Sequence, residues 1–212
     1  MPKQDLLPTD FTRVVYIVDD DEAVRDSLEW LLKGNGFITS CHESAERFLQ
    51  ALSSAKPMEC ACILLDINLP GISGIDLQKK LKDEEHKIPI AFLTGAQKVS
   101  QAVEALKQGA FDFIQKPFKE DSLCKLIQEM LDKCYIDMQH DEEIKVAQSK
   151  LKSLTKREKE VLECLMDGCT NRETGARLEI SIKTVEAHRS NIMDKLGVNR
   201  AATLLKLAIS HN

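Results

Sequence analysis

Five short apolar runs constrain the fold of this chain more than any other feature. Each is rich in β-branched and aliphatic residues, and each is followed by a segment whose apolar residues recur at helical spacing. The runs lie at 14–18, 37–41, 62–66, 88–94 and 111–114. Strands that alternate with helices through short connections form a parallel sheet with helices on both faces. We therefore expect an α/β domain in the N-terminal part of the chain.

Polar residues stand where these runs end. Asp19 and Asp20 follow the first run, Asp66 ends the third, Thr94 ends the fourth and Lys116 follows the fifth. In a flavodoxin-like (βα)5 order the first and third strands are neighbours, and ligands bind outside their carboxyl ends. We expect three carboxylates to meet in one crevice there, with a hydroxyl and an ammonium group beside them.

Such an arrangement suits phosphoryl chemistry. Clustered carboxylates repel one another unless a cation or a proton intervenes, and oxygen ligands together with phosphate favour Mg²⁺. Asp66 could then act as a nucleophile and form an acyl phosphate. A magnesium-dependent phosphatase of the haloacid-dehalogenase kind is an alternative, because Asp19 and Asp21 formally satisfy its DxD pattern.

The joint pattern of an acidic pair, an Asp, a Thr and a Lys-Pro at successive strand ends resembles the receiver domain of bacterial two-component response regulators. The resemblance covers about residues 13–135. It implies that Asp66 accepts a phosphoryl group. It also implies that Mg²⁺ is held by Asp19, Asp20, Asp66 and the main-chain carbonyl of Asn68.

The same resemblance assigns roles to the last two strands. It implies that Thr94 and Lys116 bind the phosphoryl oxygens and that the peptide bond between Lys116 and Pro117 is cis. Thr94 and Phe113 fall at the positions of the family's conformational switch. For Phe113, a plain core aromatic is the alternative.

The last third of the chain differs in charge and pattern. Residues 1–140 hold 16 Lys and Arg against 23 Asp and Glu, a net of −7, whereas residues 141–212 hold 13 against 11, a net of +2. No strand candidate occurs there, and capping boxes at 155–158 and 170–173 open two helices. With a longer helix from Ser181, the pattern predicts a helix-turn-helix arrangement that permits nucleic-acid binding.

Segments 154–162 and 181–198 resemble the LuxR-type DNA-binding domain. Together with the receiver, this makes the chain similar to NarL/FixJ response regulators, and the Thr-Val-Glu-x-His-Arg run beginning at Thr184 is closer to the FixJ branch. The fold class expected is a flavodoxin-like receiver followed by a small all-α helix-turn-helix domain. The expected boundaries are 1–135 for the receiver, 136–150 for a helical linker and 151–212 for the DNA-binding domain.

The helix from Ser181 would enter the major groove with its early exposed residues toward the base edges. The resemblance puts Glu186, Ala187 and Ser190 at base-facing positions, although Glu186 could instead be a solvated charge. Arg189 could meet either guanine or phosphate. The residues expected at phosphates are Arg172, Lys183, Thr184, Lys195 and Arg200.

Two segments depart from the family pattern. Thr174-Gly175 replaces the usual Ile-Ala, and we expect a less stable or more mobile second helix, with Gly175 keeping space between crossing helices. The Thr174 hydroxyl needs a hydrogen-bond partner if it is buried. The loop 95–100 differs from the Gly-His-Gly-Asp-x-Pro-like run of FixJ relatives, so the resemblance does not predict the conformation of this loop. The phosphoryl chemistry is still expected to persist.

We expect a phosphorylation-controlled transcription factor, not an enzyme beyond its own phosphoryl transfer and dephosphorylation. The implied partners are a sensor histidine kinase, double-stranded promoter DNA, RNA polymerase and, when phosphorylated, a second copy of the chain. A DNA-binding regulator whose receiver serves only for dimerisation is an alternative.

The composition narrows the setting. No apolar run approaches the roughly 20 residues of a membrane span, and the N-terminus lacks signal-peptide features, so a cytoplasmic protein without a membrane partner is expected. The seven cysteines are scattered without a CxxC pair, which predicts reduced, buried thiols.

Overall fold

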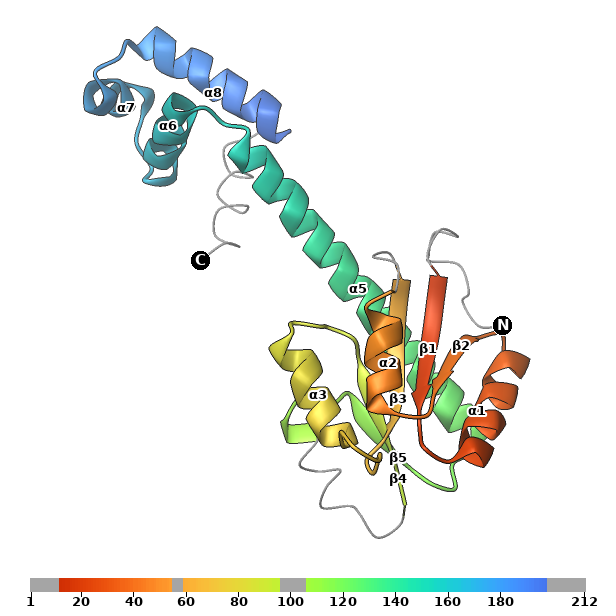
Figure 1. Cartoon of the computed structure of the whole chain (residues 1–212). Helices are drawn as coiled ribbons and strands as arrows, with labels where there is room; N and C mark the ends of the chain where they lie inside the picture. The colour runs from red at the N-terminus through yellow and green to blue at the C-terminus, as the bar shows by residue number, and fades with distance from the viewer. Residues whose placement is uncertain (1–11, 55–58, 96–105, 198–212) are drawn as a thin grey trace. The chain divides into compact units, whose positions relative to one another are not determined.

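The structure is a computed structural model, and it describes residues 12–54, 59–95 and 106–197 (Figure 1). The chain divides into two compact units, residues 1–139 and 140–212. Most of the segment that follows the fourth apolar run, the end of the expected DNA-binding domain and Arg200 lie outside the described residues. None of the described helices is long and apolar enough to cross a bilayer.

The first unit contains a parallel five-stranded sheet in the order β2-β1-β3-β4-β5. Its strands are β1 (Thr12–Val18), β2 (Ile38–His42), β3 (Glu59–Asp66), β4 (Ile90–Thr94) and β5 (Asp112–Gln115). The predicted flavodoxin-like order is confirmed, because β1 pairs with both β2 and β3. Val18 is in register with Leu65, so the acids that follow β1 and end β3 leave the sheet at the same edge.

Three of the described helices of this unit begin where the sequence provides a capping side chain. The helices are α1 (Glu22–Gly34), α2 (Ala45–Leu52), α3 (Gly74–Asp83) and α5 (Glu120–Lys152). Asp21, Ser44 and Ser73 accept hydrogen bonds from backbone N–H groups at the starts of α1, α2 and α3. The segment expected as a helical linker, 136–150, is helical and belongs to α5.

Alternating residues of β1 face opposite sides of the sheet, as strand geometry requires. Val14, Tyr16 and Val18 belong to a core that includes residues of α2 and α3, whereas Val15 and Ile17 belong to one that includes residues of α1 and α5. Both faces of the sheet are therefore covered, and polar groups can gather only at its edges.

The second unit holds the end of α5 and the helices α6 (Lys156–Met166), α7 (Asn171–Leu178) and α8 (Ile182–Leu196). Both predicted capping boxes are present: Thr155 pairs with Glu158 and Thr170 with Glu173. Its core is built from Leu154, Val161, Leu162, Val185, Ile192 and Leu196. The short α7, a tight turn and the longer α8 form the expected helix-turn-helix.

The two unusual residues of α7 lie at its packed face. A Cβ added to Gly175 would lie 2.8 Å from the carbonyl oxygen of Ile180, so the expected close approach is confirmed. Thr174 is fully buried, and its Oγ1 has no hydrogen-bond partner among the described residues. The partner expected for this hydroxyl is therefore absent from the described part of the chain.

Candidate functional site

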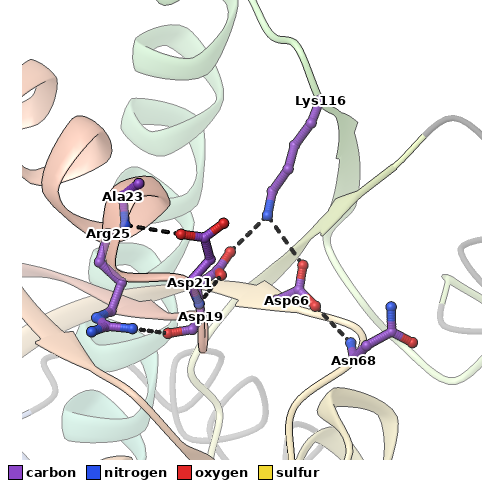
Figure 2. A network of polar contacts seen from close by, with 7 residues as sticks. All are labelled: Asp19, Asp21, Ala23, Arg25, Asp66, Asn68 and Lys116. Atoms are coloured by element: carbon purple, nitrogen blue, oxygen red, sulfur yellow. Dashed lines mark hydrogen bonds and ion pairs between the residues drawn. The ribbon is translucent and has the colours of Figure 1, made fainter.

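Two carboxylates meet one ammonium group at the carboxyl edge of the sheet (Figure 2). Lys116 Nζ donates to Asp19 Oδ2 at 2.7 Å and to Asp66 Oδ1 at 3.2 Å. Asp19 follows β1, Asp66 ends β3 and Lys116 follows β5, so residues from three strands form one charged cluster. The Asp66 side chain is 15 % exposed, which leaves its carboxylate accessible from solvent.

Main-chain contacts orient Asp66 at the end of β3. Its Oδ2 accepts a hydrogen bond from the Asn68 N–H at 2.7 Å, and Oδ1 faces Lys116. The next helix, α3, begins against the same strand end, where Gly74 N–H donates to the Ile67 carbonyl at 3.0 Å. A Cβ at Gly74 would overlap the Asp66 carbonyl oxygen, so this close approach requires glycine.

Asp19 is a buried acid, with only 1 % of its surface exposed. Burial raises the pKa of its carboxyl, although hydrogen bonds from Lys116 and from the Asp21 N–H act in the opposite direction. Burial alone would lower the pKa of Lys116, but the hydrogen bonds and charges of Asp19 and Asp66 outweigh it and raise that pKa. Lys116 therefore stays protonated, and its positive charge compensates only part of the cost of burying the Asp19 carboxylate.

The donor chemistry at this edge fits a hard divalent cation, since carboxylate and carbonyl oxygens are available beside a partly compensated buried acid. The ligands are not all assembled, however. Asp20 is exposed, and within the described ranges no three His, Cys, Asp or Glu side chains form a group that could hold a metal. The structure thus brings Asp19 and Asp66 together but does not gather Asp20 with them.

Thr94 lies on β4, the strand next to β3, and Phe113 lies on β5, which pairs with β4. Thr94 ends β4, is almost fully buried and donates its hydroxyl to the Gly95 carbonyl at 3.0 Å. The Lys116 N–H donates to the Thr94 carbonyl at 2.7 Å, and the Lys116–Pro117 peptide bond is cis, as expected. Phe113 is half-buried and packs against the core on the α2 and α3 side of the sheet.

Sequence reasoning missed Arg25 at this site. Its Nη1 donates to the main-chain carbonyl of Asp19 at 2.8 Å (Figure 2). The available signal is its spacing: Arg25 lies one helical turn beyond Asp21, which caps α1 by accepting from the Ala23 N–H at 2.9 Å. The Asp21 carboxylate is thus occupied at the start of α1, which does not support the DxD alternative.

The predicted DNA contacts divide into exposed and internally bonded residues. On α8, the exposed residues are Lys183, Thr184, Glu186, Ala187 and Ser190, and on α7 Arg172 is exposed. Arg189 is half-buried and its Nη1 donates to Asn171 Oδ1. The structure thus leaves the early part of α8 open and uses Arg189 to join α8 to α7.

Lys195 is also bonded within the unit. Its Nζ donates to both carboxylate oxygens of Glu158, at 2.7 and 3.0 Å, and so joins α8 to α6. The hydrogen bond from Lys195 and one from the Thr155 N–H lower the pKa of Glu158 to about 2. Glu158 was expected only as part of a capping box; its second role depends on a residue distant in sequence.

Together these features define a class of protein. An acidic crevice with a bridging lysine at the edge of a (βα)5 sheet is the site of a receiver domain, and the helix-turn-helix unit is a DNA-binding output. The chain is a response regulator with a C-terminal DNA-binding domain.

Comparison with known proteins identifies the family. Residues 15–128 match the response regulator receiver domain, and residues 152–208 match the bacterial regulatory proteins of the luxR family. The response regulator protein TmoT of Ectopseudomonas mendocina is 37% identical over 92% of this chain and 87% of its own length. The transcriptional regulatory protein FixJ of Bradyrhizobium diazoefficiens is 35% identical over 92% and 94%, respectively.

Solved structures agree with this result. The response regulator StyR is 36% identical, with a TM-score of 0.84 over 94% of this chain and 100% of its own. The separate receiver structure FixJ-N is 38% identical, with a TM-score of 0.53 over 57% of this chain and 94% of its own. The chain therefore belongs to the response regulators that combine a receiver with a LuxR-type DNA-binding domain, as its motifs predicted.

Proposed function

We propose that this regulator accepts a phosphoryl group on Asp66 from a sensor histidine kinase and thereby controls its binding to promoter DNA. The observation that carries the proposal is the Lys116 ammonium held between Asp66 and Asp19. A positive charge fixed beside an accessible carboxylate stabilises negative charge that arrives on that carboxylate. Without such charge, phosphorylation of an acid would add to the repulsion in the crevice.

The transfer is a displacement at phosphorus. An oxygen of Asp66 forms the new bond to phosphorus while the bond from phosphorus to the kinase histidine nitrogen breaks, and the electron pair of that bond returns to the imidazole. Lys116 shifts its hydrogen bonds to the phosphoryl oxygens, and the Thr94 hydroxyl turns from the Gly95 carbonyl to donate to another of them. Phe113 then follows Thr94 as the second member of the switch.

Mg²⁺ is the proposed cofactor, held by Asp19, Asp20, Asp66 and the main-chain carbonyl of Asn68. When bound, it neutralises charge on the phosphoryl oxygens. The partly compensated charge of buried Asp19 supports this set, and Asp20 must turn toward the crevice to complete it. The protein residues thus supply the oxygen ligands and Lys116 supplies the fixed cation.

The proposed output is DNA binding by α8. Glu186, Ala187 and Ser190 read base edges, with Lys183 and Thr184 at phosphates. Arg172 and Arg200 are the other proposed phosphate contacts. Arg189 and Lys195 contribute to DNA binding only if they give up their hydrogen bonds to Asn171 and Glu158 and bind DNA instead. The proposed domain boundaries are 1–135 for the receiver, 136–150 for the helical linker and 151–212 for the DNA-binding domain. The phosphorylated form acts as a dimer with RNA polymerase, in the cytoplasm.

The test incubates the protein with acetyl phosphate and measures its mass by intact-protein mass spectrometry, which detects the gain of one phosphoryl group. Wild type should gain it only with Mg²⁺, and Asp66→Asn should not. Asp83→Asn, which alters an exposed acid at the end of α3, is the matched control and should behave as wild type. Equal gain by Asp66→Asn would refute the site, and equal operator binding by treated wild type and Asp66→Asn would instead favour a dimerisation-only receiver.

A further inference from the structure

The loop between β1 and α1 contains the acid pair Asp19–Asp20, and side-chain hydrogen bonds stabilise the conformation of this loop. It consists of Asp19, Asp20 and Asp21, the three residues between Val18 and Glu22. Asp21 caps α1, and its own N–H donates to Asp19 Oδ1 at 3.0 Å. These two contacts fix the carboxylates of Asp19 and Asp21, but neither fixes the peptide unit that joins Asp19 to Asp20.

Arg25 is the side chain that fixes this peptide unit. Asp19 uses its N–H for the His42 carbonyl at 3.2 Å and its carboxylate for Lys116 and Asp21. Its carbonyl oxygen accepts from Arg25 Nη1 at 2.8 Å. Because a peptide unit is planar, a fixed carbonyl oxygen also fixes the nitrogen and Cα of the next residue, Asp20.

The two cations that contact Asp19 approach from different sides. Figure 2 shows Lys116 at the carboxylate and Arg25 at the main-chain carbonyl. In the proposed reaction Lys116 transfers hydrogen bonds to the phosphoryl group, so its hold on Asp19 weakens at that stage. The bond from Arg25 involves no atom that takes part in the reaction and is unaffected by this change.

We propose that Arg25 is a positioning residue that fixes the main chain of the Asp19–Asp20 acid pair, from which the Asp20 side chain turns to reach the divalent cation. This inference rests on the proposed function, since it concerns the cation of the same site. Arg25 acts through the main chain and touches neither the cation nor the phosphoryl group. Its removal leaves both acids in place but frees the peptide unit that carries Asp20, so a rotation of the Asp20 side chain alone no longer brings its carboxylate to the cation, and the main effect falls on cation affinity.

The test compares Arg25→Met, which keeps an unbranched stem without an N–H donor, with Arg25→Lys, which keeps the charge and one donor nitrogen. Mg²⁺ affinity of the full chain is measured by calorimetry before any phosphodonor is added. Arg25→Met should bind Mg²⁺ about 10-fold more weakly, in line with the effect of other groups that orient metal ligands, and Arg25→Lys should recover part of the loss. Arg47→Met, which removes an exposed guanidinium from α2, is the matched control.

Phosphorylation by acetyl phosphate separates positioning from general damage. For Arg25→Met the Mg²⁺ concentration for half-maximal rate should rise about 10-fold, while the rate at saturating Mg²⁺ stays near that of wild type. A lower saturating rate with unchanged Mg²⁺ affinity would overturn the inference, as would identical Mg²⁺ affinities of wild type and Arg25→Met. Arg25→Gln replaces Arg25→Met if circular dichroism shows that the latter is unfolded.

The same data distinguish the two proposals. If wild type binds Mg²⁺ and gains a phosphoryl group while Arg25→Met matches it throughout, only the role of Arg25 is refuted. If wild type itself gains no phosphoryl group, the proposed function fails, and the inference fails with it.

Discussion

Replacement of Thr174 by Val should stabilise the DNA-binding unit, although a core residue normally tolerates change poorly. Thr174 is fully buried in α7, and its Oγ1 finds no partner in the described part of the chain. Val has nearly the same shape and a methyl group where Thr has its hydroxyl. The substitution therefore removes a desolvated polar group without opening a cavity.

The magnitude follows from two terms. A buried hydroxyl that has lost its hydrogen bonds to water costs roughly 1–3 kcal/mol, whereas the helix propensities of Thr and Val are almost equal. The net gain expected is about 1–2 kcal/mol in the free energy of unfolding of the second unit. A gain of about 1 kcal/mol slows exchange through unfolding about fivefold.

Hydrogen exchange followed by mass spectrometry measures this in the full chain, on peptides that cover α7. Thr170→Val is the matched control, because the same change at the start of α7 removes a cap, with an expected loss of about 0.5–2 kcal/mol. Exchange should become slower in Thr174→Val and faster in Thr170→Val. Faster exchange in both variants would show that the Thr174 hydroxyl has a stabilising partner, and the reasoning would be wrong.

Two further predictions concern charged groups. The pKa of Glu158 is lowered from its usual 4.5 to about 2, so the stability that its carboxylate contributes is present above pH 4.5 and is lost as the pH falls toward 2. The thermal unfolding midpoint of Glu158→Gln, measured by circular dichroism, should be lower than that of wild type at pH 7. Between pH 4.5 and pH 2 this midpoint should also depend less on pH than that of wild type. The pKa of Asp19 is raised from 3.8, so ionisation of its carboxyl costs stability as the pH rises above 3.8. Asp19→Asn should therefore unfold at a higher temperature than wild type at pH 7, while it loses Mg²⁺-dependent phosphorylation. A lower unfolding temperature for Asp19→Asn would contradict this.

The strand order and the meeting of Asp19, Asp66 and Lys116 could be predicted because both depend on local patterns. Apolar runs locate the strands, and the parallel topology sends every carboxyl end to one edge. The capping boxes at Thr155 and Thr170 were predictable for the same reason, since each is complete within four residues.

What sequence could not give is the partner that each polar side chain selects. Arg189 and Lys195 looked like free basic residues on a DNA-binding helix, yet Asn171 and Glu158 bind them from other helices. Arg25 had no visible role because its acceptor is a main-chain carbonyl, which every residue carries. Such choices depend on the packing of helices in space, which a residue pattern does not specify.

The parallel sheet also sets the order in which the chain can mature during synthesis. One face of the sheet, with Val15 and Leu64, is covered in part by Leu123 and Leu131 of α5. The ribosome makes that helix only after all five strands, so the part of this face that α5 covers stays open until then. The described part of the second unit is helical, and helical domains fold faster than those built on non-local strand pairing, so this unit can fold soon after it emerges. The receiver is therefore made first, and it is the unit that depends longer on protection from aggregation.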